Sequence, residues 1–165
     1  MTVFLLLFLS VSAGAEVLEP DSKVAFLGLV FMDTSTEGAY NGERSDETER
    51  LALLEGIIEQ RFRDEGIPLM DLSPIAEKLE NTANVANCYG CEVRMAEALG
   101  ADFVMVGMVQ KVSNLIISMN LSLRDVGTGQ VMLARSVEVR SNTDQSWSRG
   151  MRYILKTAFF RKNED

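Results

Sequence analysis

The stretch from Leu115 to Val126 alternates between apolar and polar residues, and no other pattern in this chain constrains the fold as strongly. Its apolar positions share one face of a predicted strand: Ile117, Met119, Leu121 and Leu123. Its polar positions share the other face: Ser118, Asn120, Ser122 and Arg124. Such alternation indicates a strand with one dry and one wet face. Gly127 to Gly129 then predict a hairpin turn into a second alternating strand over residues 131–140.

The remaining patterns predict helices and two further long strands. Residues 23–32 and 102–112 are apolar runs rich in β-formers, and the first is expected to be a central strand buried on both faces. Helical spacing predicts helices over residues 45–66, 73–79, 91–99 and 141–159, with a Ser141-x-x-Asp144 capping box opening the last. A short strand is expected over 67–70, and a polar loop follows Asp33. The order βαβααβββα predicts one α/β domain, a mixed sheet that ends in an antiparallel meander with helices packed on it.

The amino terminus has the features of a secretory signal. Val3–Val11 is an apolar run of nine residues, and Ala13-x-Ala15 fits a signal-peptidase site, although Met1 and Thr2 supply no basic residue. The run is too short to span a bilayer as a helix, and no later segment is long and apolar enough. We therefore expect a signal peptide over residues 1–15, a domain over 16–165 and a periplasmic location without a transmembrane segment. No cysteine follows the run, so lipid attachment there is not expected.

The complete absence of histidine excludes several kinds of chemistry. A Ser-His-Asp triad, a His-ligated zinc site and covalent haem attachment all need that side chain. Neither glycine-rich phosphate-binding motif occurs, and the net charge of −8 disfavours nucleic acid as a partner. The sequence therefore predicts a protein that is not an enzyme and needs no cofactor.

Cys88 and Cys91 form a C-x-x-C pair at the predicted start of a helix, and three interpretations stay open. A disulfide that clips a loop to the helix is the structural one, favoured in an oxidising compartment. A redox or sensing role would use the helix dipole, which lowers the pKa of a thiol. Metal binding would need further ligands, and in this chain only carboxylates could supply them.

The acidic segment after Asp33 suggests a second candidate for ligand binding. Asp33, Ser35, Glu37 and Gly38 fit the first positions of a calcium loop, but Arg44 stands where the bidentate glutamate belongs. A looser oxygen-ligand site through Asp33 and Glu37 remains as a hypothesis beside an ordinary solvated loop.

Charge is unevenly distributed, with a net −12 over residues 16–102 and +4 over residues 103–165. Three basic residues are expected on one face of the last helix: Arg149, Arg152 and Lys156. These three residues are candidates for partner binding, and so are Ser118, Asn120 and Arg124 of the polar strand face. Glu138 and Arg140 extend that polar face. Both surfaces could equally be ordinary solvated faces.

Several blocks, in order along the chain, resemble a family of secreted proteobacterial proteins of unknown function. They are Asp33-Thr34-Ser35, Glu37-Gly38, Asn41-Gly42, Asp46-Glu47, Asn87 to Glu92, Leu99 to Asp102, Val109 to Leu115, Arg124 to Val126, Thr128-Gly129, Asn142 to Asp144, Ser146-Trp147 and Arg149-Gly150. The fold pattern also resembles the small α/β domains of the TolB amino-terminal and CsgG types, which are binding and assembly modules. The resemblance implies an envelope location and association with a periplasmic oxidation or envelope system.

Three hypotheses of function follow. The leading one is a periplasmic accessory or protein-interaction module without catalytic activity, with an unidentified envelope protein as partner. The alternatives are a thiol-disulfide redox or sensing protein that uses Cys88 and Cys91, and a carrier of a metal or small ligand.

Overall fold

The computed structural model describes residues 17–42 and 44–161, so the predicted signal peptide lies outside the described residues. Four strands form one mixed sheet in the order β1-β2-β3-β4: β1 (Val24–Asp33), β2 (Phe103–Ser113), β3 (Ile116–Asp125) and β4 (Val131–Arg140). β1 and β2 are parallel, and β2 to β4 form an antiparallel meander. The predicted mixed α/β fold is confirmed.

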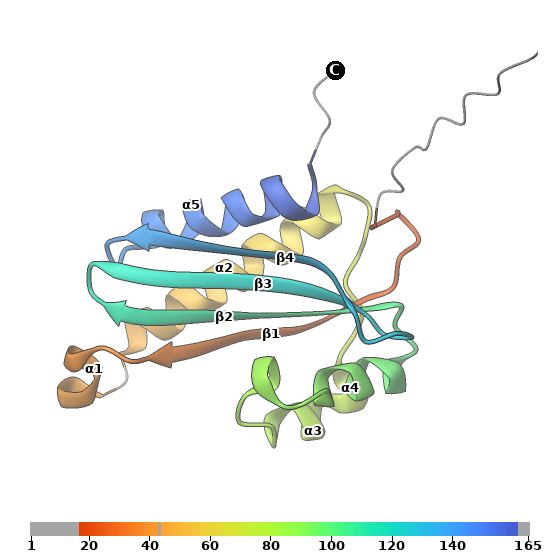
Figure 1. Cartoon of the computed structure of the whole chain (residues 1–165), viewed down its shortest axis with the longest axis horizontal. Helices are drawn as coiled ribbons and strands as arrows, with labels where there is room; N and C mark the ends of the chain where they lie inside the picture. Colours follow the sequence, from red (N-terminus) through yellow and green to blue (C-terminus); the bar gives the residue numbers. More distant parts are fainter. Residues whose placement is uncertain (1–16, 43, 162–165) are drawn as a thin grey trace, which may run out of the picture.

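Two helical layers flank the sheet unequally (Figure 1). On one face α2 (Ser45–Asp64) and α5 (Asp144–Ile154) pack side by side over the strands, and α5 continues into a π-helical turn, η3 (Leu155–Phe159). On the other face the short turns η1 (Ser73–Ile75) and η2 (Val85–Asn87) accompany α3 (Ala76–Glu80) and α4 (Cys91–Leu99). Of these, α4 and η2 contact β1 and β2. None of the helices in the described ranges has the length and apolar character needed to cross a membrane.

The main core lies between the sheet and the α2–α5 layer. Trp147 and Met151 of α5 are fully buried against the inward residues of β3, and Phe62 of α2 packs edge-on against Phe160 with ring centroids 4.9 Å apart. Gly150 allows the close approach, because a Cβ there would lie 2.7 Å from Val139 Cγ1. A second, smaller core lies beneath α4.

β1 contains a bulge that ties it to α2. Gly28 adopts a φ of +94°, a left-handed conformation that favours glycine, and the register with β2 shifts between Phe26 and Leu29. The backbone N–H of Leu29 is satisfied by the carboxylate of Glu55, at 2.9 Å. Burial raises the pKa of Glu55 above its ordinary value, although this hydrogen bond opposes the shift.

Several details differ from the sequence prediction. β1 is buried over its first half but is an edge strand, because no strand of the described residues pairs with its outer side, where Met70 N donates to Val24 O at 3.0 Å. The strand predicted over 67–70 was therefore wrong, since one such bond does not make a ladder. Helix α1 (Thr36–Asn41) occupies the predicted polar loop, capped by Ser35, whose Oγ accepts from Gly38 N.

The capping box predicted for the last helix was also wrong. Thr143, and not Ser141, caps α5, because its hydroxyl accepts from Ser146 N. At the start of α2, Arg44 stands at the N-cap without a side-chain cap, and Asp46 lies inside the first turn.

Candidate functional site

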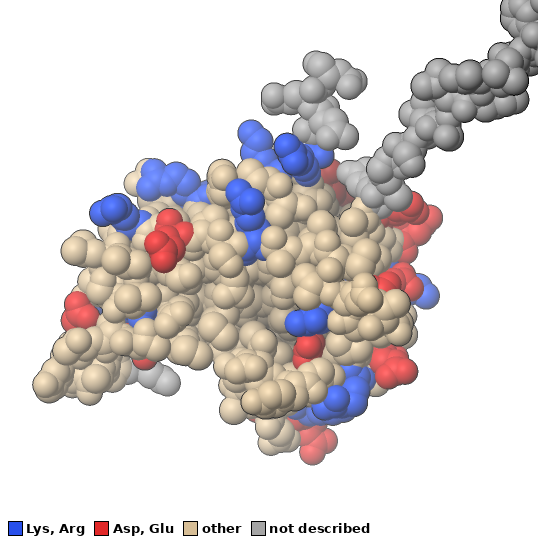
Figure 2. Space-filling model, viewed as in Figure 1, with Lys and Arg blue, Asp and Glu red and all other residues tan. Residues whose placement is uncertain are grey.

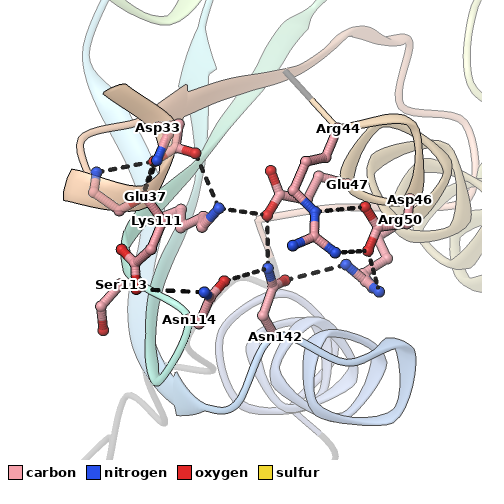
Figure 3. Close-up of polar contacts among 12 residues, drawn as sticks. Asp33, Glu37, Arg44, Asp46, Glu47, Arg50, Lys111, Ser113, Asn114 and Asn142 are labelled. Carbon is pink, nitrogen blue, oxygen red and sulfur yellow. Dashed lines mark hydrogen bonds and ion pairs between the residues drawn. The ribbon is translucent and has the colours of Figure 1, made fainter. Parts of the chain in front are cut away.

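A cluster of charged and amide side chains lies where β1 and β2 end, beside the first turn of α2 (Figure 3). At its centre the ammonium of Lys111 donates to Glu47 Oε1 at 2.7 Å and to Asp33 Oδ2 at 3.0 Å. The side chains of Lys111 and Glu47 are each only 1% exposed. A charge this deeply buried persists because opposite charges and hydrogen bonds compensate its lost hydration.

Amide side chains extend the cluster to the loop before α5. Asn142 donates to Glu47 Oε1 at 2.7 Å, and its own oxygen accepts from Arg50, which also pairs with Asp144 at 2.8 Å. Asn114 donates to Glu37 at 3.3 Å. The cluster therefore joins β1, α1, α2, the β2–β3 turn and the start of α5 (Figure 3). Five of the twelve blocks quoted above for the family resemblance supply its members.

The pKa directions agree with a cluster held as ions. Burial would raise the pKa of Asp33, but hydrogen bonds from Ser35 and the nearby Lys111 lower it below its ordinary value. Burial would lower the pKa of Lys111, but Glu47 and Asp33 raise it above its ordinary value. Lys111 therefore remains protonated and is held in place by two carboxylates.

This geometry does not favour a cation between Asp33 and Glu37. The oxygens of Asp33 accept from Ser35 and from Lys111, so a positive charge already lies 3.0 Å away. Glu37 instead faces Asn114. The metal hypothesis for Asp33 and Glu37 stays a prediction without structural support.

The buried ion pair of Lys111 and Glu47 was not predicted from the sequence. The sequence contained a signal for it, since Lys111 lies on the same inward face of β2 as the alternate residues Met105, Gly107 and Val109. A lysine in an inward phase predicts a buried charge that needs partners.

The C-x-x-C pair forms a disulfide in the loop before α4. Between the two cysteines, Tyr89 has a φ of +54° and is 94% exposed. Glu92, which follows Cys91, is buried. Its Oε2 lies 3.2 Å from Cys88 Sγ, and its Oε1 lies 3.5 Å from Arg124 Nε of β3. Cys88, Cys91 and Glu92 are the group of potential metal ligands that the described part of the chain brings together, but both thiols are committed to the bridge.

The polar strand face is only partly covered, and we name its uncovered part the open sheet face. It consists of Ser118, Asn120, Ser122, Ala134, Ser136 and Glu138. The β3 members are half-buried and the β4 members exposed, whereas the opposite side of β3 is fully buried. Figure 2 shows a broad area with few charges over the strands, below the basic side chains that gather over α5. Arg124 lies at the end of this face, where Glu92 joins it to α4.

The predicted basic residues of α5 are all exposed, but they do not form one site. Arg152 and Lys156 line a groove between α5 and α2, whereas Arg149 is not among the residues lining it. α5 packs on the covered side of the sheet, so the basic surface and the open sheet face lie on opposite sides. The structure therefore separates the candidate partner-binding residues into two surfaces.

Residues 22–159 match a family described as "Protein of unknown function (DUF2380)", DUF3280. The chain belongs to this family. The match spans the sheet and all the helices described above, so the predicted recognition of a family of unknown function is confirmed. No curated protein matches the chain.

Solved structures of similar fold include the LpoB C-terminal domain from Salmonella enterica. That match has a TM-score of 0.55 at 15% identity and covers 77% of this chain and 88% of the LpoB chain. A PelC dodecamer from Paraburkholderia phytofirmans matches with a TM-score of 0.50 at 15% identity, over 84% of this chain and 87% of that one. TolB from Acinetobacter baumannii is also similar, with a TM-score of 0.41 at 16% identity, over 81% of this chain and 28% of the TolB chain. At these identities the matches show a shared fold and nothing about activity.

Proposed function

We propose that this protein is a periplasmic protein-interaction domain without catalytic activity, and that its partner binds the open sheet face. The observation that carries the proposal is the incomplete second layer, because the helices on that side contact β1 and β2 and leave β4 exposed. The open sheet face presents five small or neutral side chains and one acid, Glu138, and the exposed Arg140 follows Glu138 at the end of β4. A surface with so few charges is inexpensive to desolvate, as the centre of a protein interface requires.

Tyr89 would act as an anchor at the border of this surface. Its ring is almost completely exposed. The disulfide between Cys88 and Cys91, which lie on either side of Tyr89, holds this loop to α4. The Glu92–Arg124 contact joins this loop region to the end of the open sheet face. A rigid, exposed tyrosine supplies large contact area at a small entropic cost, and tyrosine is enriched among residues that dominate binding energy.

The location and the lack of catalysis are parts of the same proposal. An apolar amino-terminal run with Ala13-x-Ala15 and a disulfide between the two cysteines support export to an oxidising compartment. The histidine-free composition and the neutralised Lys111 support a binding role over catalysis.

Affinity capture from native periplasm tests the proposal. Asn120→Arg with Ser136→Arg introduces charge on the open sheet face, and Arg149→Glu is the matched control because it alters an exposed residue on the other side. We expect the wild type and the control to retain one specific partner and the double variant to lose it. Capture lost only in the control would assign binding to α5, and no partner for any variant would contradict the proposal.

The redox alternative has one observation in its favour and one against it. Cys91 is the first residue of α4, where the helix dipole lowers the pKa of a thiol. The carboxylate of Glu92 lies 3.2 Å from Cys88 Sγ, and a negative charge there disfavours a thiolate. The geometry therefore supports the interaction domain better.

A further inference from the structure

A groove of about 520 Å³ runs between α2 and the end of α5, on the covered side of the sheet and away from the open sheet face. Its α2 side is one helical stripe: Leu53, Gly56, Ile57, Gln60, Arg61 and Asp64. Its other side is formed by Arg152 of α5 and by Leu155 and Lys156 of η3. The volume falls within the range of about 300–1,000 Å³ that small-molecule sites occupy.

The floor of the groove is apolar and is left open by a glycine. Leu53 is 40% exposed, and Leu155 closes the bottom. A Cβ built on Gly56 would meet nothing within 4 Å, so the space above this residue is empty. Glycine costs a helix interior stability, and here it keeps the floor free of a side chain. Leu155 also begins the π-helical turn, in which Phe160 N donates to Leu155 O at 2.9 Å, and such turns are frequent at functional sites.

The charged side chains that line the groove are Arg61 and Asp64 of α2, Arg152 of α5 and Lys156 of η3. α2 and α5 run in the same direction, since Arg50 lies over Trp147 near their starts and Phe62 contacts Phe159 near their ends. In this register Lys156 lies near Gln60 and Arg61, and Arg152 lies about one turn nearer to Leu53. Arg61 already pairs with Glu65, whereas no carboxylate of residues 17–42 or 44–161 lies within ion-pair distance of Arg152 or Lys156.

We propose that this groove binds a single-chain amphipathic anion, such as a medium-chain carboxylate. The alkyl chain would lie over Leu53, Gly56 and Ile57, and the carboxylate would meet Arg152 and Lys156. Charge complementarity decides the head group, because the lining carries three cations and one acid in a chain whose net charge is −8. The apolar lining consists of only Leu53, Gly56, Ile57 and Leu155, which favours one alkyl chain over a partner helix, since a helix needs a broad apolar surface.

Isothermal titration calorimetry with decanoate, below its micelle concentration, tests the site. Decanol and decyltrimethylammonium share the alkyl chain and differ in charge, so they separate head-group recognition from general apolar binding. Gly56→Leu adds a side chain where a Cβ would meet nothing within 4 Å, and Arg152→Glu with Lys156→Glu reverses the charge of the rim. Arg149→Glu is the matched control on the same helix but outside the groove lining.

We expect one decanoate per chain, no binding to Gly56→Leu, unchanged binding to Arg149→Glu and a loss of about tenfold or more with the reversed rim. Decyltrimethylammonium should not compete. Equal binding of the three probes, equal binding by Gly56→Leu and the wild type, or no binding of decanoate would overturn the proposal. Loss of the captured periplasmic partner from Gly56→Leu would instead make the groove a protein-docking surface and would also overturn it. Partner capture through the open sheet face does not depend on decanoate, so the two proposals can fail separately.

Discussion

The two faces of β3 differ sharply, although they belong to the same ten residues. Toward α2 and α5, the side chains of Ile117, Met119, Leu121 and Leu123 are fully buried. Toward the other side, Ser118, Asn120 and Ser122 stay half-buried and meet no complete helical layer. One face therefore supplies stability, and the other is free to serve as a binding surface. The predictions below separate these roles, beginning with the largest expected effect on stability.

Lys111→Ala should cause the largest loss, at the end of the covered face. It leaves Glu47 buried without its cation and removes one partner of Asp33, so we expect about 3–5 kcal/mol of lost unfolding free energy in urea denaturation. Lys111→Met combined with Glu47→Leu removes both buried charges and should recover most of that loss. If Lys111→Ala unfolds at the same urea concentration as the wild type, the cluster does not hold the sheet to α2.

Leu121→Ala and Ser122→Ala compare adjacent residues on the two faces. Leu121 is fully buried, so its truncation should cost about 2–5 kcal/mol, measured as a shift in the urea midpoint. Ser122 lies on the open sheet face, and its truncation should change stability by no more than about 0.5 kcal/mol. Comparable losses at both positions would remove the distinction between the faces.

Replacing both cysteines by serine should have a smaller effect. The bridge joins residues three apart, so it restricts the unfolded chain little, and the expected loss is about 2 kcal/mol or less. Partner capture should persist, weakened by a looser Tyr89. A reversible dithiol couple near the periplasmic redox poise, measured against glutathione, would favour the redox alternative instead.

Gly56→Ala should raise the stability of the fold. The site has open space for a methyl group, and alanine is favoured over glycine in a helix interior by up to about 1 kcal/mol. Thermal denaturation measures the gain in stability. The affinity for decanoate should fall, because the added methyl group fills part of the groove. A destabilised variant would mean that Gly56 is required by packing and not by the groove.

Asp46→Asn should have the smallest effect, and one that depends on pH. Hydrogen bonds from Arg44 and Arg50 lower the pKa of Asp46 to about 2, so its contribution is present above the unfolded pKa of about 4. That contribution disappears as the pH falls through about 2, and it stays below about 1 kcal/mol because the pair is exposed and screened. Urea midpoints of both proteins from pH 7 to pH 2 should converge at the acid end; a constant gap would contradict this assignment.

The sequence predicted the sheet well because alternation reports burial directly. The inward and outward residues of β3 follow the pattern, as do Val137 and Val139 of β4, which pack on the main core. The edge position of β1 could not be predicted in this way, because α2 and the turns on the other side bury the first half of this edge strand as thoroughly as a central one.

The candidate site was harder to predict, because its partners are distant in sequence. Lys111 was visible as a lysine among the inward positions of its strand, but its contact with Glu47 depends on the docking of α2. The contact of Asn142 with Glu47 depends on the docking of the start of α5. Helix α1 was hidden by the polar composition of its segment, although Ser35 is a good capping residue. The separation of Asn120 from Arg152 likewise depends on which face of the sheet each element covers, which local patterns do not encode.

Site-specific photo-crosslinking tests the binding role of the open sheet face most directly. A photoreactive phenylalanine analogue would replace Ser136, which is exposed on β4, or Arg149, which is exposed on α5. The partner should form an adduct with the probe at Ser136 and none with the probe at Arg149. An adduct at Arg149 alone, or no adduct at either position in intact periplasm, would contradict the account.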